Sequence, residues 1–312
     1  MTDTYKVKDF IETQEGLLFA VVAESLEADK VLCFLRYVLS KQGWKKVNTL
    51  AANQYLNTYH PQYLFFSAER DAHLHAVAPD AIIKHYAPQT RLQQLLAEVA
   101  PDQVIVDLQE LCRLLAGEGV VLPHLGITGS LLPGVYNPES DIDIVCYDRA
   151  VFHHIRQRLK HHLAAQQCHN LQAQDWLASY ERRDCDLSLA DYIWHEQRKF
   201  NKGMINQRKF DLSLVIPGTE SKLHHYHKLG AIQLQTLVTD DHFGFDYPAQ
   251  FSLQHAEIQT LVSYTATYTG QAITGEQVLI SGQLEADEAG RKRIVVGSNR
   301  EAKGEYIKVI RA

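Results

Sequence analysis

The sequence predicts an α+β protein, in which a small N-terminal α+β domain and a C-terminal β-rich domain flank a central domain of mixed α/β structure. Three observations predict this layout. Residues 1–95 alternate short apolar runs with turn signals, and residues 96–220 interleave long helical patterns with apolar strands. Residues 221–312 are strand-like with closely spaced Gly and Asp-Glu turns, and we expect them to form a small β-barrel or sheet.

Strand patterns and one hairpin dominate the N-terminal domain. The runs "GLLFAVVAE" and "KVLCFLRYVL" are apolar and of strand length, and the turn-rich "SLEAD" joins them, which predicts a hairpin. "YLFFSA" and "DAIIKHY" are predicted as further strands. No catalytic motif is apparent in this domain, so we expect it to support chemistry that takes place elsewhere.

The central domain begins with the clearest helical pattern, "PDQVIVDLQELCRLLAGEG". Pro101 and Asp102 suit its first turn, and Gly117 and Gly119 punctuate its end. "VVLPHLGIT" then predicts a strand, and "RAVFHHIRQRLKHHLAAQQ" predicts a helix with a basic face. "QDWLASYERRDCDLSLADYIWHEQRKFNKG" is largely helical with a break near Arg183, and "RKFDLSLVIPG" is an apolar strand.

At 312 residues, with 46% hydrophobic and 22% charged residues, the chain has the composition of a globular protein with sizeable cores. No apolar run approaches the roughly 18 residues that a membrane-spanning helix needs, and "MTDTYKVKDF" has no apolar signal region, so we expect a cytoplasmic protein without membrane association. The formal net charge of −6 differs from the basic excess of non-specific nucleic-acid binders. Five scattered cysteines without a CxxC pair indicate neither a disulfide framework nor a Cys-rich zinc site.

The stretch "SDIDIVCYD" places two aspartates on an otherwise apolar strand. Residues i and i+2 of a strand point to the same side, so Asp141 and Asp143 share one face while Ile142 and Ile144 point into a core. Two carboxylates this close repel each other, and burial of an unpaired carboxylate is costly. A hard divalent cation, Mg²⁺ or Mn²⁺, would compensate both charges, since these ions prefer oxygen ligands.

Gly129 and Ser130 lie just upstream, at the end of a predicted strand. A glycine there permits a turn that brings backbone N–H groups against a phosphate, and Ser130 adds a hydroxyl donor. Two neighbouring strands would then carry a phosphate site and a metal site together. A nucleoside triphosphate with its Mg²⁺ requires that combination.

Gly129-Ser130, a gap of ten residues, and Asp141-Ile142-Asp143 within an apolar strand follow one another in this order. This arrangement resembles the active-site motif of the DNA polymerase beta-type nucleotidyltransferase superfamily, and the preceding Ser140 suits the common "SDID" form of that motif. The whole chain resembles a family of predicted nucleotidyltransferases that carry this domain in the middle.

The resemblance implies that Asp141 and Asp143 bind the metal ions and that a third carboxylate lies on a later, neighbouring strand. Asp211 in "RKFDLSLVI" is the preferred candidate, because it opens an otherwise apolar strand. Asp186 in "RRDCDLSLADY" is the alternative, although it leads into helix-like sequence. By resemblance, Asp211 would help hold the catalytic metal and take the proton from the attacking hydroxyl.

The implied reaction is in-line attack of an acceptor hydroxyl on the α-phosphate of a nucleoside triphosphate such as ATP, with release of pyrophosphate. Arg208 and Lys209 are candidates to bind the nucleotide, with Arg198, Lys199 and Lys202 upstream as further basic residues. The acceptor stays open among a short RNA, a small molecule and a protein, and the outer domains are expected to shape its site or a homo-oligomer interface. The alternative function is a non-catalytic nucleotide-binding sensor or a scaffold on the same fold.

Overall fold

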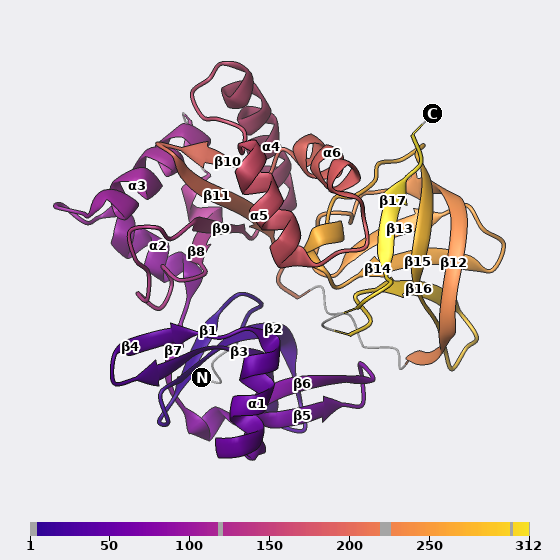
Figure 1. Cartoon of the computed structure of the whole chain (residues 1–312), viewed down its shortest axis with the longest axis horizontal. Coiled ribbons are helices and arrows are strands. Elements are labelled where there is room, and N and C mark those ends of the chain that lie inside the picture. The colour runs from indigo at the N-terminus through magenta and orange to yellow at the C-terminus, as the bar shows by residue number, and fades with distance from the viewer. Residues whose placement is uncertain (1–4, 118–120, 219–225, 300–301, 312) are drawn as a thin grey trace. The chain divides into compact units, whose positions relative to one another are not determined.

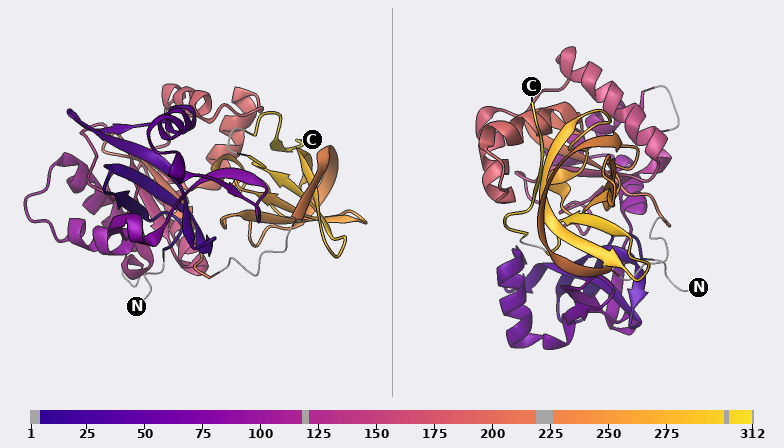
Figure 2. Two further views of the ribbon diagram at one scale, coloured as in Figure 1. Left: turned by 90° about the horizontal axis from the view of Figure 1, so that it is seen from below. Right: turned by 90° about the vertical axis from the view of Figure 1, so that its right-hand side faces the viewer.

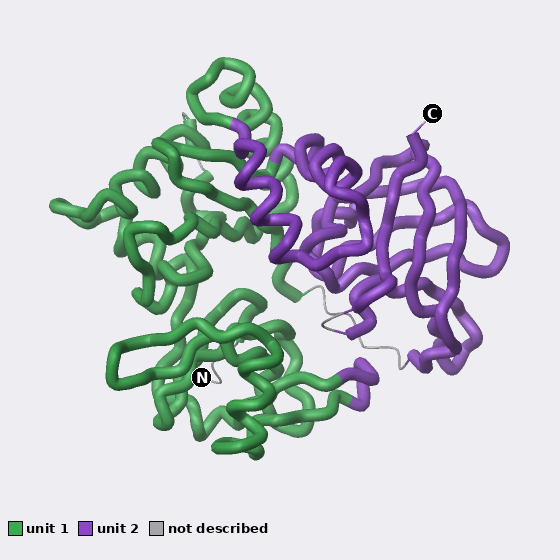
Figure 3. Tube along the Cα trace, viewed as in Figure 1, with its two compact units in different colours: residues 1–67, 73–169, 201–222 green, residues 68–72, 170–200, 223–312 purple. Residues whose placement is uncertain are grey.

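A computed structural model describes residues 5–117, 121–218, 226–299 and 302–311. It contains helices and three β-sheets, which confirms the α+β class (Figure 1). The chain divides into two compact units: residues 1–67, 73–169 and 201–222, and residues 68–72, 170–200 and 223–312 (Figure 3). The expected boundary after residue 95 falls inside the first unit, and the one after residue 220 lies outside the described residues, so the division into three domains stays a prediction.

The N-terminal sheet has seven strands in the order β5-β6-β3-β2-β1-β7, with β4 paired to β3. Their bounds are Phe10–Thr13 (β1), Leu17–Glu27 (β2), Lys30–Ser40 (β3), Gly43–Lys46 (β4), Leu64–Ser67 (β5), Ala72–Val77 (β6) and Ile82–Tyr86 (β7). β2 and β3 pair antiparallel, with Glu27 opposite Lys30, which confirms the predicted hairpin. Helix α1 (Thr49–Tyr59) begins after Asn48, whose side chain accepts a hydrogen bond from the Ala51 N–H.

Both faces of the N-terminal sheet carry buried apolar side chains. Successive residues of a strand point to opposite faces, and in β1 and β2 both sets include apolar residues. On one face, Ile11 and Phe19 belong to a cluster that includes Leu56 of α1. On the other face, a second cluster includes Tyr37 together with Leu132, which lies just beyond the predicted phosphate-binding turn. This second face therefore contacts the segment that carries the nucleotidyltransferase-like motif.

The second sheet has four strands in the order β10-β11-β9-β8: β10 is Lys202–Ile205, β11 is Arg208–Leu214, β9 is Ile142–Cys146 and β8 is Leu125–Thr128. β9 runs antiparallel to β8 and parallel to β11. Parallel neighbours need a crossover connection, and the chain between β9 and β11 carries three helices and β10. Five helices precede these strands or lie between them in the sequence: α2 (Pro88–Leu96), α3 (Gln103–Ala116), α4 (Arg149–Ala164), α5 (Ala173–Arg183) and α6 (Leu189–Lys199).

The helix ends follow local signals in the sequence. α3 begins after Asp102, whose carboxylate accepts a hydrogen bond from the Ile105 N–H at 3.1 Å, and it ends before Gly117, whose φ is +56°. The expected break near Arg183 is confirmed, because Asp184 has a left-handed φ of +47° and separates α5 from α6. The strand predicted in "VVLPHLGIT" is shorter than expected, since its proline lies in a 3₁₀ turn.

α4 has 16 residues and is the longest helix in the described part of the chain. It is amphipathic: Phe152, Ile155 and Leu159 are buried, and basic residues occupy the rest of its surface, as the sequence predicts. Over the residues that the structure describes, no helix is both long enough and apolar enough to cross a membrane.

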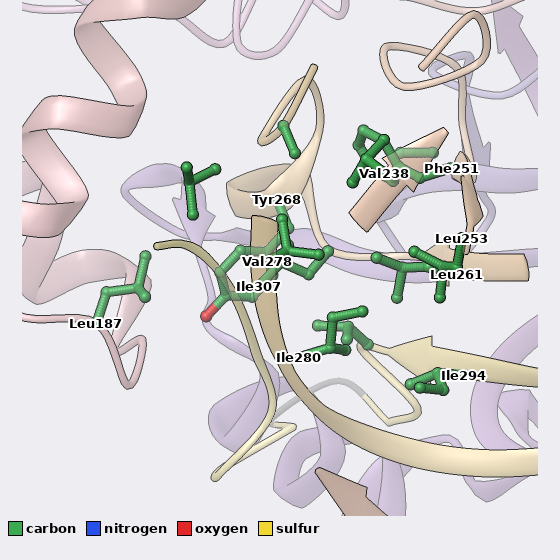
Figure 4. Packing of buried hydrophobic residues seen from close by; sticks show 14 of the residues in the cluster. Leu187, Val238, Phe251, Leu253, Leu261, Tyr268, Val278, Ile280, Ile294 and Ile307 are labelled. Carbon is green, nitrogen blue, oxygen red and sulfur yellow. The ribbon is translucent and has the colours of Figure 1, made fainter. Parts of the chain in front are cut away.

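The C-terminal sheet has six strands in the order β12-β13-β14-β16-β15-β17, and an added pairing of β12 with β15 closes it on itself (Figure 2). Their bounds are Tyr226–Asp240 (β12), Ala249–Leu253 (β13), Ile258–Ser263 (β14), Gln277–Asp287 (β15), Lys292–Val296 (β16) and Tyr306–Val309 (β17). Aliphatic and aromatic side chains fill the interior, among them Val238, Phe251, Ile280, Ile294 and Ile307 (Figure 4). This closed sheet confirms the expected β-rich C-terminal segment.

A buried histidine connects α6 to this closed sheet within the second unit. His195 is 1% exposed. Its Nδ1 lies 2.7 Å from the Asp191 carbonyl oxygen, and its Nε2 accepts a hydrogen bond from the Val309 N–H at 3.1 Å. A neutral ring with the proton on Nδ1 satisfies both contacts. Burial away from water lowers the pKa of His195 to about 4.

Candidate active site

A row of polar side chains crosses the four strands of the second sheet. Lys202 of β10 lies opposite Asp211 of β11, and Asp211 lies opposite Asp143 of β9. Asp143 in turn lies opposite Thr128 of β8. Directly paired residues present their side chains on the same face of a sheet, and Asp141, two residues before Asp143, belongs to that face as well. The fold therefore brings the three predicted carboxylates together on one face.

The opposite face of this sheet is apolar and fixes the row in place. Ile142 and Ile144 alternate with the aspartates of β9, and Phe210 and Leu212 alternate with Asp211 on β11. All four of these apolar side chains are almost completely buried. A slip of one residue in either strand would turn a carboxylate into the core, so burial of the apolar face specifies the register.

Asp143 is half-buried and is surrounded by charge. The pKa of its carboxyl group is raised to about 6, mainly by burial and in addition by repulsion from Asp211 and Asp141. The ammonium groups of Lys8 and Lys46 act in the opposite direction. The carboxylates thus destabilise one another, and additional positive charge would relieve that repulsion.

Gly129 forms the turn that the sequence predicts next to this carboxylate. Its φ is +66°, a left-handed conformation that a residue with a side chain rarely adopts. A Cβ atom at this position would lie 2.1 Å from Oδ2 of Asp143, so the turn passes directly against the carboxylate. The next residue, Ser130, is half-buried, and its carbonyl accepts a hydrogen bond from the Val135 N–H at 3.0 Å. The turn at Gly129 therefore lies beside the row, and Ser130 follows it directly in the sequence.

Two lysines approach the carboxylates of the row. Nζ of Lys202 lies 3.6 Å from Oδ2 of Asp211, and Nζ of Lys209 lies 3.9 Å from Oδ1 of Asp141. Lys209 is one of the predicted nucleotide-binding residues, and Lys202 is one of the basic residues expected upstream. Both contribute positive charge where the sequence predicts metal ions and a triphosphate.

The three aspartates have the chemistry of a hard-cation site, since their donors are all carboxylate oxygens. Within the described ranges, however, no three His, Cys, Asp or Glu side chains already converge on one point. Asp211 and Asp141 extend toward lysines instead. The residues fit Mg²⁺ or Mn²⁺ by donor type, by shared face and by the mutual repulsion at Asp143.

Arg208 has a different environment from the one the sequence predicts. Its Nε donates to Oδ2 of Asp107 on α3 at 2.8 Å, and Asp107 is 1% exposed. Its Nη1 donates to the carbonyl oxygens of Pro138 and Ser140 at 2.7 and 2.8 Å. The guanidinium group thus ties the segment before Asp141 to α3, and nucleotide binding by Arg208 stays a prediction.

Three candidate site residues from the sequence analysis lie in the second unit and not at the row. Asp186, the alternative third carboxylate, lies between α5 and α6 and accepts a hydrogen bond from the Gly304 N–H at 2.7 Å. Arg198 lies 2.6 Å from a carboxylate oxygen of Glu276. Lys199 is 2% exposed and lies 2.5 Å from Glu196. Each therefore has a partner within its own unit. Of the two candidates for the third carboxylate, Asp211 is the one that is paired with Asp143.

Three residues that interact with members of the row are absent from the predicted set: Thr128, Lys8 and Lys46. Thr128 directly precedes Gly129, so its place at a strand end is a signal that the sequence does contain. Lys8 and Lys46 belong to the N-terminal domain, and no spacing in the sequence connects them to the aspartates. Only the packing of the N-terminal sheet against the Gly-Ser segment brings them near.

One curated protein resembles the chain over its whole length. "Uncharacterized protein MJ1086" of Methanocaldococcus jannaschii is 31% identical over an alignment of 340 residues, which covers 98% of this chain and 99% of that protein. The chain belongs to the MJ1086 family. The likeness to MJ1086 extends over both compact units and includes the segment with the aspartates. No family model and no solved structure matches the chain.

Proposed function

We propose that the chain is a metal-dependent nucleotidyltransferase that moves a nucleoside monophosphate from a nucleoside triphosphate to an acceptor hydroxyl and releases pyrophosphate. One observation carries this proposal: Asp143 and Asp211 are direct partners across two parallel strands, with the left-handed turn of Gly129 against Asp143. This arrangement combines an acidic cation site with a turn that can approach a phosphate.

Asp141, Asp143 and Asp211 would hold the metal ions, Mg²⁺ or Mn²⁺. When bound, these ions neutralise charge on the oxygens of the transferred phosphate. Without a cation the carboxylates repel one another, as the raised pKa of Asp143 indicates. A bound cation would remove this repulsion, which favours its binding. Lys202 and Lys209 then become available to anionic groups of the substrate.

The residues of the chain perform the remaining steps. The turn at Gly129-Ser130 binds phosphate oxygens through backbone N–H groups and the serine hydroxyl. The oxygen of the acceptor hydroxyl forms a bond to the α-phosphorus while the bond from that phosphorus to the pyrophosphate oxygen breaks. Asp211 takes the hydroxyl proton. Its side chain is 38% exposed, the least buried of the three carboxylates, and so can meet an incoming acceptor.

The layout expected from the sequence fits this function. A central nucleotidyltransferase domain, residues 96–220, would lie between an N-terminal α+β domain and a C-terminal β-rich domain that shapes the acceptor site or a homo-oligomer interface. The acceptor is a short RNA, a small molecule or a protein hydroxyl, and the protein acts in the cytoplasm. The net charge of −6 favours a small or short acceptor over a long polyanion.

The lysines favour a second candidate, a non-catalytic nucleotide-binding protein on the same fold. Lys202 and Lys209 lie 3.6 and 3.9 Å from carboxylates of the row, where they could replace metal ions in balancing charge. Such a protein would bind a nucleotide without transferring any part of it. The two candidates differ in one measurable property, the transfer of label from an α-phosphate.

The test is to incubate the protein with each α-³²P-labelled NTP and Mg²⁺ or Mn²⁺, with RNA, small metabolites and protein extract as acceptors. The double variant Asp141→Asn/Asp143→Asn should transfer no label, and Asp186→Asn, the matched control in the second unit, should transfer as much as the parent. NTP binding without transfer would favour the sensor. Neither binding nor transfer would exclude both candidates.

A further inference from the structure

We propose that the N-terminal sheet completes the nucleotide site, and that Lys8 and Lys46 bind the β- and γ-phosphates of the triphosphate. The inference rests on the proposed function and assigns a role to a domain in which the sequence shows no chemistry. It is carried by a backbone contact at Lys8 and by the place of Lys46 on the face of the sheet that contacts the Gly-Ser segment.

Lys8 is connected directly to the row of carboxylates. The Thr128 hydroxyl donates a hydrogen bond to the Lys8 carbonyl oxygen at 2.9 Å, and Thr128 is the cross-strand partner of Asp143. The φ of Lys8 is +79°, an unfavourable value for a lysine, and its N–H donates to the Val21 carbonyl at 3.1 Å. The surrounding structure thus holds a lysine in a strained conformation beside the site, and strain of this kind is concentrated at functional positions.

Lys46 lies on the face of the N-terminal sheet that contacts the Gly-Ser segment. It is the last residue of β4 and is paired directly with Tyr37 of β3, so the two side chains share a face. Tyr37 is buried in the cluster that includes Leu132, two residues beyond Ser130. Lys45, the preceding residue, is exposed and is paired with Val38, so it lies on the opposite face.

The charges on the two sheets affect each other across this contact. Lys8 and Lys46 both lower the pKa of Asp143, against the effect of burial and of the other two aspartates. Asp143 in turn raises the pKa of Tyr37. Interactions of this kind require proximity, because solvent ions screen exposed charges beyond about 10 Å. Both lysines therefore interact electrostatically with a carboxylate of the row.

A triphosphate needs more positive charge than the row can supply. Two divalent cations roughly balance three carboxylates, which leaves the phosphate charge to be met by other cations. Lys202 and Lys209 already face Asp211 and Asp141 from β10 and β11. Lys8 and Lys46 come from the other sheet, so a triphosphate placed between the two sheets would have cations on both sides.

The experiment measures the affinity of a non-hydrolysable ATP analogue, and of AMP, for the full chain in the presence of Mn²⁺. The variants are Lys8→Gly and Lys46→Gln, with Lys45→Gln as the matched control on the opposite face. Lys8→Gly removes the charge but relieves the left-handed strain and keeps the carbonyl that Thr128 contacts. Urea unfolding of this variant, compared with that of the parent, separates a loss of charge from a loss of folding.

We expect each site variant to bind the triphosphate analogue about tenfold more weakly, while AMP binding and Lys45→Gln change little. Mn²⁺ binding without nucleotide, followed by electron paramagnetic resonance, should stay the same or tighten, because a neighbouring positive charge is removed. Triphosphate affinity equal to that of the parent in both variants would overturn the inference and leave the proposed function standing. A parent protein that binds no nucleotide would overturn both.

Discussion

Asp211 and Asp143 lie directly opposite each other in the parallel pairing of β11 with β9. Without a cation, this relationship is unfavourable: like charges repel, and Asp143 is half-buried, so the pKa of Asp143 is raised to about 6. The apolar residues on the other face hold the two strands in this register regardless of that cost. Repulsion between paired carboxylates lowers the stability of the folded protein, and such repulsion is typical of a binding site rather than of a structural strand pair.

The first prediction is that Asp143→Asn stabilises the metal-free protein while it removes the response to metal. Loss of the repelled charge should raise the free energy of unfolding at pH 7.5 by about 1 kcal/mol, a value kept small because the side chain is partly solvated. Urea unfolding with and without Mn²⁺ measures both effects. Asp186→Asn is the control and should retain the stabilisation by Mn²⁺. A destabilised Asp143→Asn protein would contradict the repulsion argued here.

The second prediction concerns the turn against Asp143. Gly129 and Gly134 both have positive φ values, +66° and +76°, but a Cβ at Gly134 would meet only Arg91 Nη2 at 3.9 Å. Gly134→Ala should therefore cost only the strain of the left-handed backbone, about 1 kcal/mol. Gly129→Ala adds the clash with the carboxylate of Asp143, so it should cost more and abolish stabilisation by Mn²⁺. Equal effects in the two variants would show that the contact with Asp143 is unimportant.

The third prediction tests Arg208 as a positioning residue. Arg208→Met leaves the buried carboxylate of Asp107 without its ion-pair partner and should lower the free energy of unfolding by about 3 kcal/mol. Arg208→Lys keeps the charge but cannot reach Asp107 and the carbonyls of the segment before Asp141 together, so it should lose about half as much. Thermal and urea unfolding provide the measurement. A variant that loses nucleotide affinity at unchanged stability would instead assign Arg208 to substrate binding.

The fourth prediction is a pH dependence that originates at His195. Its pKa in the folded protein is about 4, below the 6.5 of an unfolded histidine, because burial disfavours the charged ring. The unfolded chain therefore takes up a proton at a higher pH than the folded one. The stability that the neutral ring contributes is complete above pH 6.5 and decreases as the pH falls toward 4, by roughly 1.4 kcal/mol per pH unit. Urea unfolding at pH 7.5, 6.5 and 5.5 measures this decrease.

His161, an exposed histidine of α4, gives the control for this pH dependence. The variant His161→Gln should reproduce the pH profile of the parent. The variant His195→Gln should unfold more easily at pH 7.5 and should lose most of the decrease between pH 6.5 and 5.5. A parent whose stability changes between pH 6.5 and 5.5 by the same amount as that of His195→Gln would show that the ring of His195 is protonated or accessible to water in the folded protein, since Asp143 titrates alike in both proteins.

Local patterns in the sequence predicted several parts of the fold. The hairpin of β2 and β3 and the helix that begins after Asp102 are both present as expected. Asp141 and Asp143 share a face because alternation along a strand is a property of two neighbouring peptide units. Gly129 is a turn residue because a left-handed φ favours a residue without a side chain. None of these features depends on distant parts of the chain.

The tetrapeptide Asp-Leu-Ser-Leu occurs twice and shows that a short local sequence does not always determine secondary structure. At Asp186 it leads into α6, and its serine caps the helix by accepting a hydrogen bond from the Asp191 N–H. At Asp211 the same four residues lie in β11, beside Asp143. Identical residues thus adopt a helix start in one place and a strand in the other. The neighbouring sheet and core decide between them.

The sequence by itself determined the faces of single strands, the ends of single helices and the Gly-Ser and Asp-x-Asp motif, because each depends on residues a few positions apart. Only the tertiary structure decided that Asp211 is the partner of Asp143, that Arg208 faces Asp107, and that the N-terminal sheet contacts the Gly-Ser segment. A parallel strand pair is joined through a long crossover, and two sheets meet by packing. Such contacts follow from how the whole chain buries its apolar faces, which no short stretch of sequence specifies.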